Sequence, residues 1–206
     1  AQRDPRKTPV GIDELARLEA LARREIHEQV RDGGSVGTAW RDYFHIILGG
    51  ASVPAASQSR LIDSLWEAHR RFGLWTTPID DGPQVVAQVR KRFTIGVVSN
   101  AEGNVARDLD AAGYAGQFGV VIDSHVVGVE KPDPAIFRIA LERLGKQAQT
   151  TVFVGDLPAV DVAGARAAGI TPILLDRHDL YPDTGSHRIR SIGDLPRLLD
   201  TAPRSS

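Results

Sequence analysis

Between residues 11 and 72, apolar side chains recur at steps of three or four residues, which is the spacing of one face of an α-helix. The first stripe consists of Leu15, Leu18, Ala22, Ile26 and Val30. The second consists of Trp40, Phe44 and Ile47, and the third of Leu61, Leu65, Ala68 and Phe72. Gly33-Gly34 ends the first stripe, and no strand pattern interrupts the three. The pattern predicts a small all-helical domain, which we place at residues 1–79.

After a turn at residues 77–82, the pattern changes to short apolar runs that alternate with helical stretches. The apolar runs predict strands buried on both faces, at residues 94–98, 120–122, 151–154 and 171–175. The helical stretches each end at a glycine and cover residues 102–112, 134–144 and 158–168. A strand stub at Ile192 and a helix over residues 193–200 are expected to close the chain. The alternation predicts an α/β fold with a doubly wound parallel sheet over residues 80–206.

The composition is that of a soluble globular protein, with 42% apolar and 25% charged residues. The formal charge of −1 offers no long-range attraction for nucleic acid or for an anionic membrane. No apolar run approaches the roughly 20 residues that span a bilayer, and no signal-peptide pattern opens the chain. Cysteine is absent, which excludes thiolate metal sites and cysteine nucleophiles. We therefore expect a cytoplasmic protein without nucleic-acid or membrane partners.

The first candidate site residues are Ser99 and Asn100, which follow the apolar run at residues 94–98. In an open parallel sheet, ligands bind beyond the carboxyl ends of the strands. The Ser99 hydroxyl and the backbone N–H groups at the start of the next helix could hold an anion there. The alternative is that Ser99 simply caps that helix.

The second candidate is Lys131, which lies within the segment Glu130-Lys131-Pro132-Asp133-Pro134. The prolines keep Lys131 in an extended loop, and Asp133 is placed to cap the next helix. A fixed ammonium group suits a phosphate oxygen or a crowded carboxylate. The alternative is an ordinary surface lysine.

The third candidate is the pair Asp156 and Asp161, after the apolar run at residues 151–154. Gly155 leaves room for close approach of the backbone. Two carboxylates so near each other repel unless a cation or Lys131 offsets them. Oxygen ligands of this kind suit Mg²⁺, so we predict a magnesium site at Asp156 and Asp161. The alternative is that both aspartates only begin the following helix.

In order and spacing, three motifs resemble the second, third and fourth motifs of the haloacid dehalogenase superfamily. They are Ser-Asn at residue 99, Lys-Pro-Asp-Pro at residue 131 and Val-Gly-Asp-(four residues)-Asp at residue 154. The likeness covers residues 80–206, and residues 1–79 are similar to the helical-bundle cap of that superfamily. It implies a Rossmann-like core and phosphoryl transfer through an aspartyl-phosphate.

The resemblance also implies a role for each candidate residue. Ser99 would bind the transferred phosphoryl group, with Asn100 beside it in the substrate site. Lys131 would stabilise the charge of the nucleophile and of the phosphate. Asp156 would ligate Mg²⁺, with Asp161 supporting it through water or through Lys131.

The first motif of the superfamily, Asp-x-Asp at the end of the first strand, does not occur in residues 1–10, which also contain no apolar strand. Asp80-Asp81-Gly82 lies in a polar turn, where turn and cap roles explain it. The missing strand would lie between the strands that end at Ser99 and Asp156, and its loss would leave unpaired strand edges. We therefore expect the nucleophile before residue 1 of the native protein; the alternative is a scaffold that has lost it.

These observations predict a magnesium-dependent phosphatase that acts on a small phosphate ester selected by the helical domain. A metal-free 2-haloacid dehalogenase is the first alternative, although those enzymes carry Ser-x-Asn-type residues where this chain has Gly155-Asp156. A non-catalytic module that binds a phosphorylated ligand is the second alternative. Trp66 and Trp75 lie in the helical part, where we expect them to serve mainly in packing.

Overall fold

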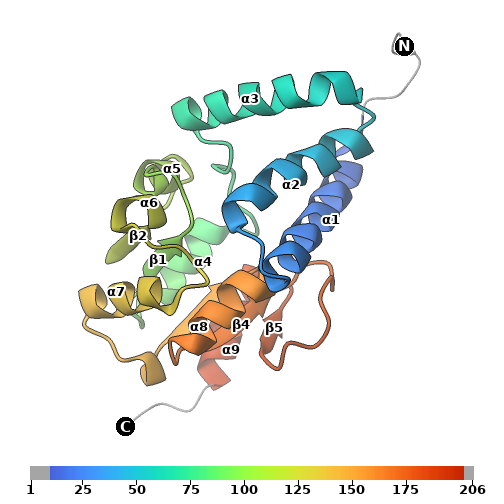
Figure 1. Cartoon of the computed structure of the whole chain (residues 1–206). Helices are drawn as coiled ribbons and strands as arrows, with labels where there is room; N and C mark the ends of the chain where they lie inside the picture. Colours follow the sequence, from blue (N-terminus) through green and yellow to red (C-terminus); the bar gives the residue numbers. More distant parts are fainter. Residues whose placement is uncertain (1–9, 202–206) are drawn as a thin grey trace. The chain divides into compact units, whose positions relative to one another are not determined.

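The computed structural model describes residues 10–201. They form two compact units that divide between Ser64 and Leu65, inside the third helix (Figure 1). The first unit is all-helical and the second is α/β, as the sequence predicts. The domain boundary that the sequence predicts between residues 79 and 80, and the role of residues 1–79 as a cap, stay predictions.

The helical unit consists of α1 (Ile12–Arg31), α2 (Val36–Gly50) and the first part of α3 (Ala55–Phe72). Its core is made of Leu18, Ala20, Ala22, Ile26, Val36, Ala39, Tyr43, Phe44 and Ile62. The first helix ends where the sequence predicts, because Gly33 has a φ of +93°, which glycine adopts without strain. No helix within residues 10–201 is long and apolar enough to cross a membrane.

The second unit alternates strands with helices. Its strands are β1 (Gly96–Ser99), β2 (Val120–Asp123), β3 (Val152–Gly155), β4 (Thr171–Leu175) and β5 (His187–Ile189). Its helices are α4 (Gly82–Val89), α5 (Val105–Ala111), α6 (Ser124–Val127), α7 (Pro134–Leu144), α8 (Ala163–Ala167) and α9 (Leu195–Thr201). Short 3₁₀ helices cover Ala148–Thr150 and Ile192–Asp194, and a π-helical turn covers Pro158–Val162.

The strands form two parallel sheets rather than one (Figure 1). One sheet pairs β1 with β2, and in the other β4 lies between β3 and β5. Ser99 lies opposite Asp123 in the first sheet, and Gly155 lies opposite Leu174 in the second. Because every pair is parallel, the carboxyl ends of neighbouring strands point in the same direction within each sheet. The prediction of a parallel α/β fold is confirmed.

The strands β1 and β3 each have one hydrogen-bonded neighbour among the described residues, and they are not paired with each other. The prediction that they are buried on both faces is wrong, because Val97, Val98 and Val154 are only half-buried. In β4, which has neighbours on both sides, Ile173 is 2% exposed and Leu174 is 0% exposed. The exposure of β1 and β3 therefore follows from their unpaired edges.

Three predicted elements differ from the structure. Ile192 begins a 3₁₀ helix, and the last strand is instead His187–Ile189. The helix predicted from residue 102 begins at Val105, because Gly103 has a φ of +93° and the Val105 N–H donates to a carboxylate oxygen of Asp123 at 3.3 Å. The helix predicted over residues 158–168 opens with the π-helical turn.

The helix α7 provides the centre of the α/β core. Ile136 and Phe137 of this helix are 0% and 1% exposed, and they belong to one apolar cluster with Ile122 of β2 and Ala165 of α8. Full burial of such a large side chain contributes about 2 kcal/mol. Asp133 caps the helix as predicted, because its side chain accepts a hydrogen bond from the Ala135 N–H. This packing fixes the start of α7 and the turn before it.

Candidate active site

Two of the three candidate segments lie at the carboxyl ends of β1 and β3, and the third is bound to both of them. Ser99 is the last residue of β1 and is half-buried, and Asp156 directly follows β3. Lys131 lies in the turn between α6 and α7. Side-chain hydrogen bonds join these segments, although the two strands are not paired.

The side chain of Asn100 holds the main chain of Lys131. Its Nδ2 donates to the Lys131 carbonyl oxygen at 2.9 Å, and its Oδ1 accepts from the Lys131 N–H at 2.8 Å. Both ends of the amide are therefore engaged by one residue. This pair of bonds fixes the backbone of the lysine beside the end of β1.

The Lys131 ammonium group is buried and paired. Its Nζ donates to Oδ1 of Asp161 at 2.8 Å, and the two side chains are 12% and 5% exposed. The same Nζ lies 5.4 Å from the centre of the Phe153 ring on β3. The interpretation of Lys131 as an ordinary surface lysine is therefore wrong. Because an unpaired charge is costly to bury, the position of this cation depends on Asp161.

Asp161 uses both carboxylate oxygens inside the protein. Oδ2 accepts from the N–H groups of Asp156 and Leu157, each at 3.0 Å, while Oδ1 binds Lys131. Burial by itself would raise the pKa of Asp161, but the ammonium of Lys131 and the two N–H groups outweigh it and hold the pKa below its usual value. The carboxylate is thus ionised and joins the lysine to the backbone after β3.

Gly155 makes the close approach of Asp161 possible. A Cβ atom at residue 155 would lie 2.4 Å from the Asp161 Cβ and 2.6 Å from its Oδ2. No side chain other than hydrogen fits there without displacing the carboxylate. The close approach predicted for Gly155 therefore allows the Asp161 carboxylate to reach the N–H groups of the residues that follow β3.

The surroundings of Ser99 differ from the prediction. Because α5 begins at Val105 with Asn104 as its N-cap, Ser99 does not cap this helix. Because α5 begins three residues later than predicted, its first N–H groups do not directly follow Ser99, where the sequence predicts an anion site. Residues 101–104 instead form a loop at the end of β1. An anion near Ser99 would therefore meet this loop and not a helix end.

Two residues that the sequence analysis did not select hold this loop. The Ser124 hydroxyl accepts from the Ala101 N–H at 3.0 Å and donates to the Ala101 carbonyl oxygen at 3.2 Å. Asp123 accepts from the N–H groups of Val105 and His125 at 3.3 and 3.0 Å. Asp123 is 6% exposed and Ser124 is 9% exposed. The signal in the sequence was a polar Asp-Ser pair directly after a buried apolar run.

The acidic residues Asp80 and Asp81 lie in the turn that leads into α4. Asp80 forms an ion pair with Arg177, and the hydrogen bond from that guanidinium lowers the pKa of Asp80. Asp81 is the N-cap residue of α4, but its side chain makes no capping hydrogen bond. Within residues 10–201, no three His, Asp or Glu side chains gather at one point. Among these residues, Asp156 and Asp161 are the acidic groups closest in sequence to the end of β3.

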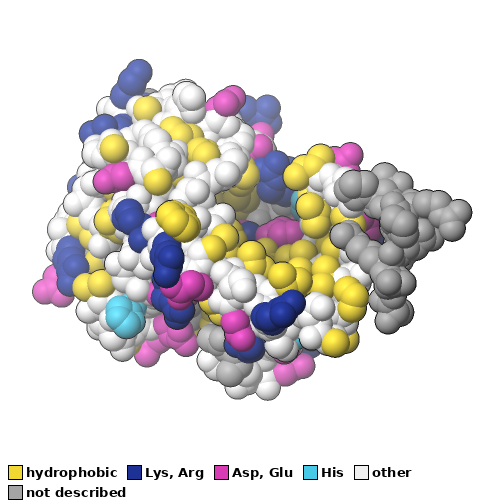
Figure 2. Space-filling model, turned by 90° about the horizontal axis from the view of Figure 1, so that it is seen from above, with side chains coloured by type: hydrophobic (Ala, Val, Ile, Leu, Met, Phe, Trp, Pro, Cys, Tyr) yellow, Lys and Arg dark blue, Asp and Glu magenta, His cyan; other side chains and the backbone are white. Residues whose placement is uncertain are grey.

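Charges of both signs are interspersed over the face that Figure 2 shows. This mixture accords with a formal net charge of −1. A surface without one continuous field provides little long-range steering. The face shown therefore offers a charged ligand little attraction from a distance.

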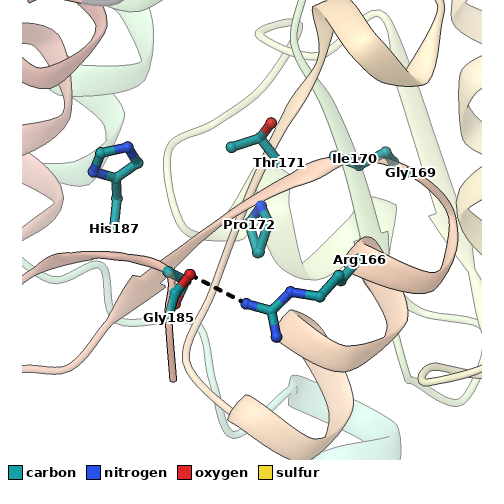
Figure 3. Close-up of a pocket in the computed structure, with 8 residues that line it drawn as sticks. Arg166, Gly169, Ile170, Thr171, Pro172, Gly185 and His187 are labelled. Carbon is teal, nitrogen blue, oxygen red and sulfur yellow. Dashed lines mark hydrogen bonds between the residues drawn. The ribbon is translucent and has the colours of Figure 1, made fainter. Parts of the chain in front are cut away.

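A separate hollow of about 600 Å³ lies at the amino end of β4 (Figure 3). It is lined by Arg166, residues 169–172 and residues 185–187. The guanidinium of Arg166 donates to the carbonyl oxygens of Thr184 at 2.9 Å and Gly185 at 3.4 Å, so it ties down the neighbouring loop. Since Ser99 and Asp156 lie at the carboxyl ends of their strands, this hollow is not their site.

A family model described as haloacid dehalogenase-like hydrolase matches residues 8–169. The match includes all the residues of the candidate site. Among curated proteins, the phosphoserine phosphatase of Thermus thermophilus is 32% identical over 153 residues, which are 73% of this chain and 59% of that protein. The glyceraldehyde 3-phosphate phosphatase of Methanopyrus kandleri is 29% identical over 189 residues, which are 85% of this chain and 79% of that protein. The match thus spans less than two thirds of the length of the first relative.

Solved structures share the fold. A 2-haloacid dehalogenase from Pseudomonas syringae pv. Tomato DC3000 has a TM-score of 0.58 and 25% identity, over 93% of this chain and 82% of that chain. The hydrolase YfnB from Bacillus subtilis, whose crystal structure contains magnesium, has a TM-score of 0.66 and 18% identity, over 94% of this chain and 85% of that chain. The similarity extends to both units of the chain.

Proposed function

The chain belongs to the haloacid dehalogenase-like hydrolases, and from this membership we propose that it is a cytoplasmic, magnesium-dependent phosphatase acting on a small phosphate ester. One observation carries the proposal, which is the pair of contacts made by Lys131. Its main chain is bound to Asn100 after β1, and its ammonium is bound to Asp161 after β3. The segments that carry Ser99 and Asp156 are thereby held around one buried cation.

Each residue has a distinct role in the proposal. The Ser99 hydroxyl donates a hydrogen bond to the phosphoryl group, and the Lys131 ammonium offsets the negative charge that phosphoryl transfer concentrates there. Asn100 contributes through Lys131, since its side-chain amide is bound to the lysine backbone. Asn100 is therefore a positioning residue in the proposal. It acts on the substrate through Lys131 and not by the direct contact that the sequence had suggested.

The donor set also suits magnesium. Mg²⁺ takes one or two protein carboxylates and fills its remaining positions with water and phosphate oxygens. Asp156 would hold the ion, while Asp161 supports the site through Lys131 and through the Asp156 N–H rather than as a direct ligand. When bound, the ion would supply further neutralisation of the phosphate charge.

The unpaired edges of β1 and β3 suggest where the nucleophile lies. We propose that a strand from before residue 1 runs parallel between them and ends in Asp-x-Asp. Its carboxyl end would then lie beside Ser99 and Lys131. An oxygen of the first Asp attacks phosphorus, the bond from phosphorus to the ester oxygen breaks, and the second Asp gives that oxygen a proton. Water then releases phosphate from the aspartyl-phosphate.

The relatives support a phosphate ester as the substrate. Two of them are named for phosphoserine and for glyceraldehyde 3-phosphate, which are both small phosphate monoesters. The acidic residue Asp156 favours a metal-dependent reaction over metal-free dehalogenation, because a carboxylate there needs a cation nearby.

Phosphate release by the protein with its native N-terminus, verified by mass spectrometry, tests the proposal. We expect release from small phosphate monoesters with Mg²⁺ and at least about tenfold less after EDTA treatment. Asp156→Asn should abolish the response to Mg²⁺, whereas the matched change Asp110→Asn on α5 should preserve it. Chloride release from 2-chloropropionate without Mg²⁺ would instead favour a dehalogenase. Stabilisation by phosphorylated ligands without any turnover would favour a binding module.

A further inference from the structure

His69, near the end of α3, connects this helix to the loop of residues 101–104 after β1. The imidazole is only 5% exposed, and its Nδ1 accepts from the Leu74 N–H at 3.1 Å. The ring proton must therefore lie on Nε2, which is 3.0 Å from Oε2 of Glu102. A neutral imidazole in this form donates to Glu102. The carboxylate is thus oriented by a hydrogen bond.

Glu102 lies shortly after the carboxyl end of β1. It belongs to the loop at the carboxyl end of β1, three residues after Ser99. Three residues of extended chain reach at most about 11 Å, so this carboxylate is close to the proposed phosphate position. Its side chain is 50% exposed, and Oε1 has no hydrogen-bond partner among the described residues. One oxygen is therefore held in place while the other is available to a ligand.

The charge of Glu102 is not offset by a neighbouring cation in the described part of the chain. Arg107, the nearest arginine along the sequence, donates to Asp108 and to the Arg70 carbonyl oxygen. The Lys131 ammonium is bound to Asp161. A carboxylate in this position would repel a substrate that carries a second anionic group and would attract one that carries a cation.

An indole ring lies beside the same histidine. Trp75 packs edge-to-face on His69 with ring centres 4.8 Å apart, and it is 43% exposed. Trp66 lies on the same imidazole at 5.5 Å. The faces of indole rings attract ammonium groups. A carboxylate and a partly exposed indole held by one imidazole therefore offer two kinds of contact to a cation.

We infer that Glu102, assisted by Trp75, selects phosphate esters whose alcohol portion carries an ammonium group. The inference rests on the proposed phosphatase function and specifies its substrate class. Because Glu102 follows Ser99 by only three residues, the two groups suit a substrate that carries its phosphate and its ammonium group on one small carbon skeleton, such as a phosphorylated amino alcohol or amino acid.

Two esters of the same size test the inference. Phosphoethanolamine and 2-hydroxyethyl phosphate differ only in an ammonium group against a hydroxyl group. We expect kcat/KM of the native protein to favour phosphoethanolamine about fivefold, as for a half-exposed ion pair. Glu102→Gln, which keeps an acceptor for His69 but removes the charge, should bring this ratio close to one. The matched change Glu142→Gln, on α7, should leave the ratio as it is.

The ratio is informative even if a variant folds incompletely, because a smaller active fraction lowers both rates equally. A ratio of one or less in the native protein, or a ratio that Glu102→Gln does not change, would overturn the inference. Failure to hydrolyse any small phosphate monoester would overturn the phosphatase proposal instead. If these two esters are not hydrolysed, their Kd values, measured by calorimetry with Mg²⁺ present, decide the inference separately. Equal Kd values, or no binding of either ester, would overturn it.

Discussion

Lys131 is held at two points, and each point can be tested by changing one side chain. Asn100 binds its backbone, and Asp161 binds its ammonium group. Because Asp161 also binds the backbone after β3, one buried carboxylate joins two parts of the site. Removal of one partner of a buried ion pair is costly, since the other charge stays in a poorly solvated place.

The low pKa of Asp161 predicts a specific dependence of stability on pH. Because the carboxyl pKa is lower in the folded than in the unfolded protein, its contribution is fully present above the unfolded pKa of about 3.9. It is lost as the pH falls through the folded value. Asp161→Asn should lower the free energy of unfolding by about 3 kcal/mol at pH 7. Below about pH 5, the variant should lose less additional stability than the wild type. Urea unfolding at several pH values measures both effects, and parallel pH curves for the two proteins would contradict the assignment.

The Asn100 side chain should contribute to stability through its two hydrogen bonds to Lys131. Asn100→Ala removes both, and we expect a loss of about 2 kcal/mol in the free energy of unfolding. Asn104→Ala provides a control, because the Asn104 side chain makes no capping hydrogen bond and its removal should cost less than about 0.5 kcal/mol. Equal losses in chemical denaturation would show that the amide does not hold the lysine.

At the scale of elements, the end of β3 and the π-helical turn after it form one arrangement. The turn covers Pro158–Val162 and carries Asp161 back towards Gly155. π-Helical turns are rare and often occur at functional sites. Here the turn allows one carboxylate to bind two successive N–H groups and the lysine.

Gly155→Ala should disrupt this arrangement, because the added methyl group would lie within 2.6 Å of three Asp161 side-chain atoms. We expect a loss of about 3 kcal/mol in the free energy of unfolding. Gly119→Ala is the matched control, since the nearest atom to its new Cβ would be 3.7 Å away, and its effect should stay within about 0.5 kcal/mol. Thermal and urea denaturation compare the two. A well-tolerated alanine at residue 155 would contradict the close approach.

Hydrogen exchange should distinguish paired from unpaired strands. In β1 and β3 about half of the N–H groups point to the edge that lacks a neighbour, whereas β4 is paired on both sides. In a protein that consists of residues 1–206, without the proposed preceding strand, we expect amides in β1 and β3 to exchange at least about tenfold faster than those in β4. Exchange followed by mass spectrometry can resolve the three segments. Equal protection would indicate that the edges of β1 and β3 are covered.

At the scale of the whole molecule, the two sheets of the α/β unit suggest an incomplete central layer. A peptide with alternating Val and Ile that ends in Asp-x-Asp should bind between β1 and β3. Because it would bind the folded state only, it should raise Tm by on the order of 5 °C at a concentration about a hundredfold above its Kd. A control peptide with lysine at alternate positions should not, since those charges would enter the core. No shift, or equal shifts with both peptides, would argue against a strand in this place.

Much of this architecture can be predicted from local patterns. The periodicity of Leu18, Ala22 and Ile26 identifies a helix that buries those residues, and the apolar run at residues 171–175 coincides with β4. The segment around Lys131 is also visible, because prolines restrict the backbone locally. The contact between His69 and Glu102 was not predictable, since it joins residues 33 positions apart without a pattern that connects them.

The sequence by itself determined the type of most elements, the parallel α/β class and the identity of the residues at the strand ends. These depend on side-chain periodicity and on backbone restrictions, which act over a few residues. Only the tertiary structure decided that Asn100 binds Lys131, that Asp161 uses both oxygens within the protein, and that β1 and β3 share no neighbouring strand within residues 10–201. Those features arise from packing between distant segments, where hydrogen-bond geometry and close contact, rather than local preference, select the partners.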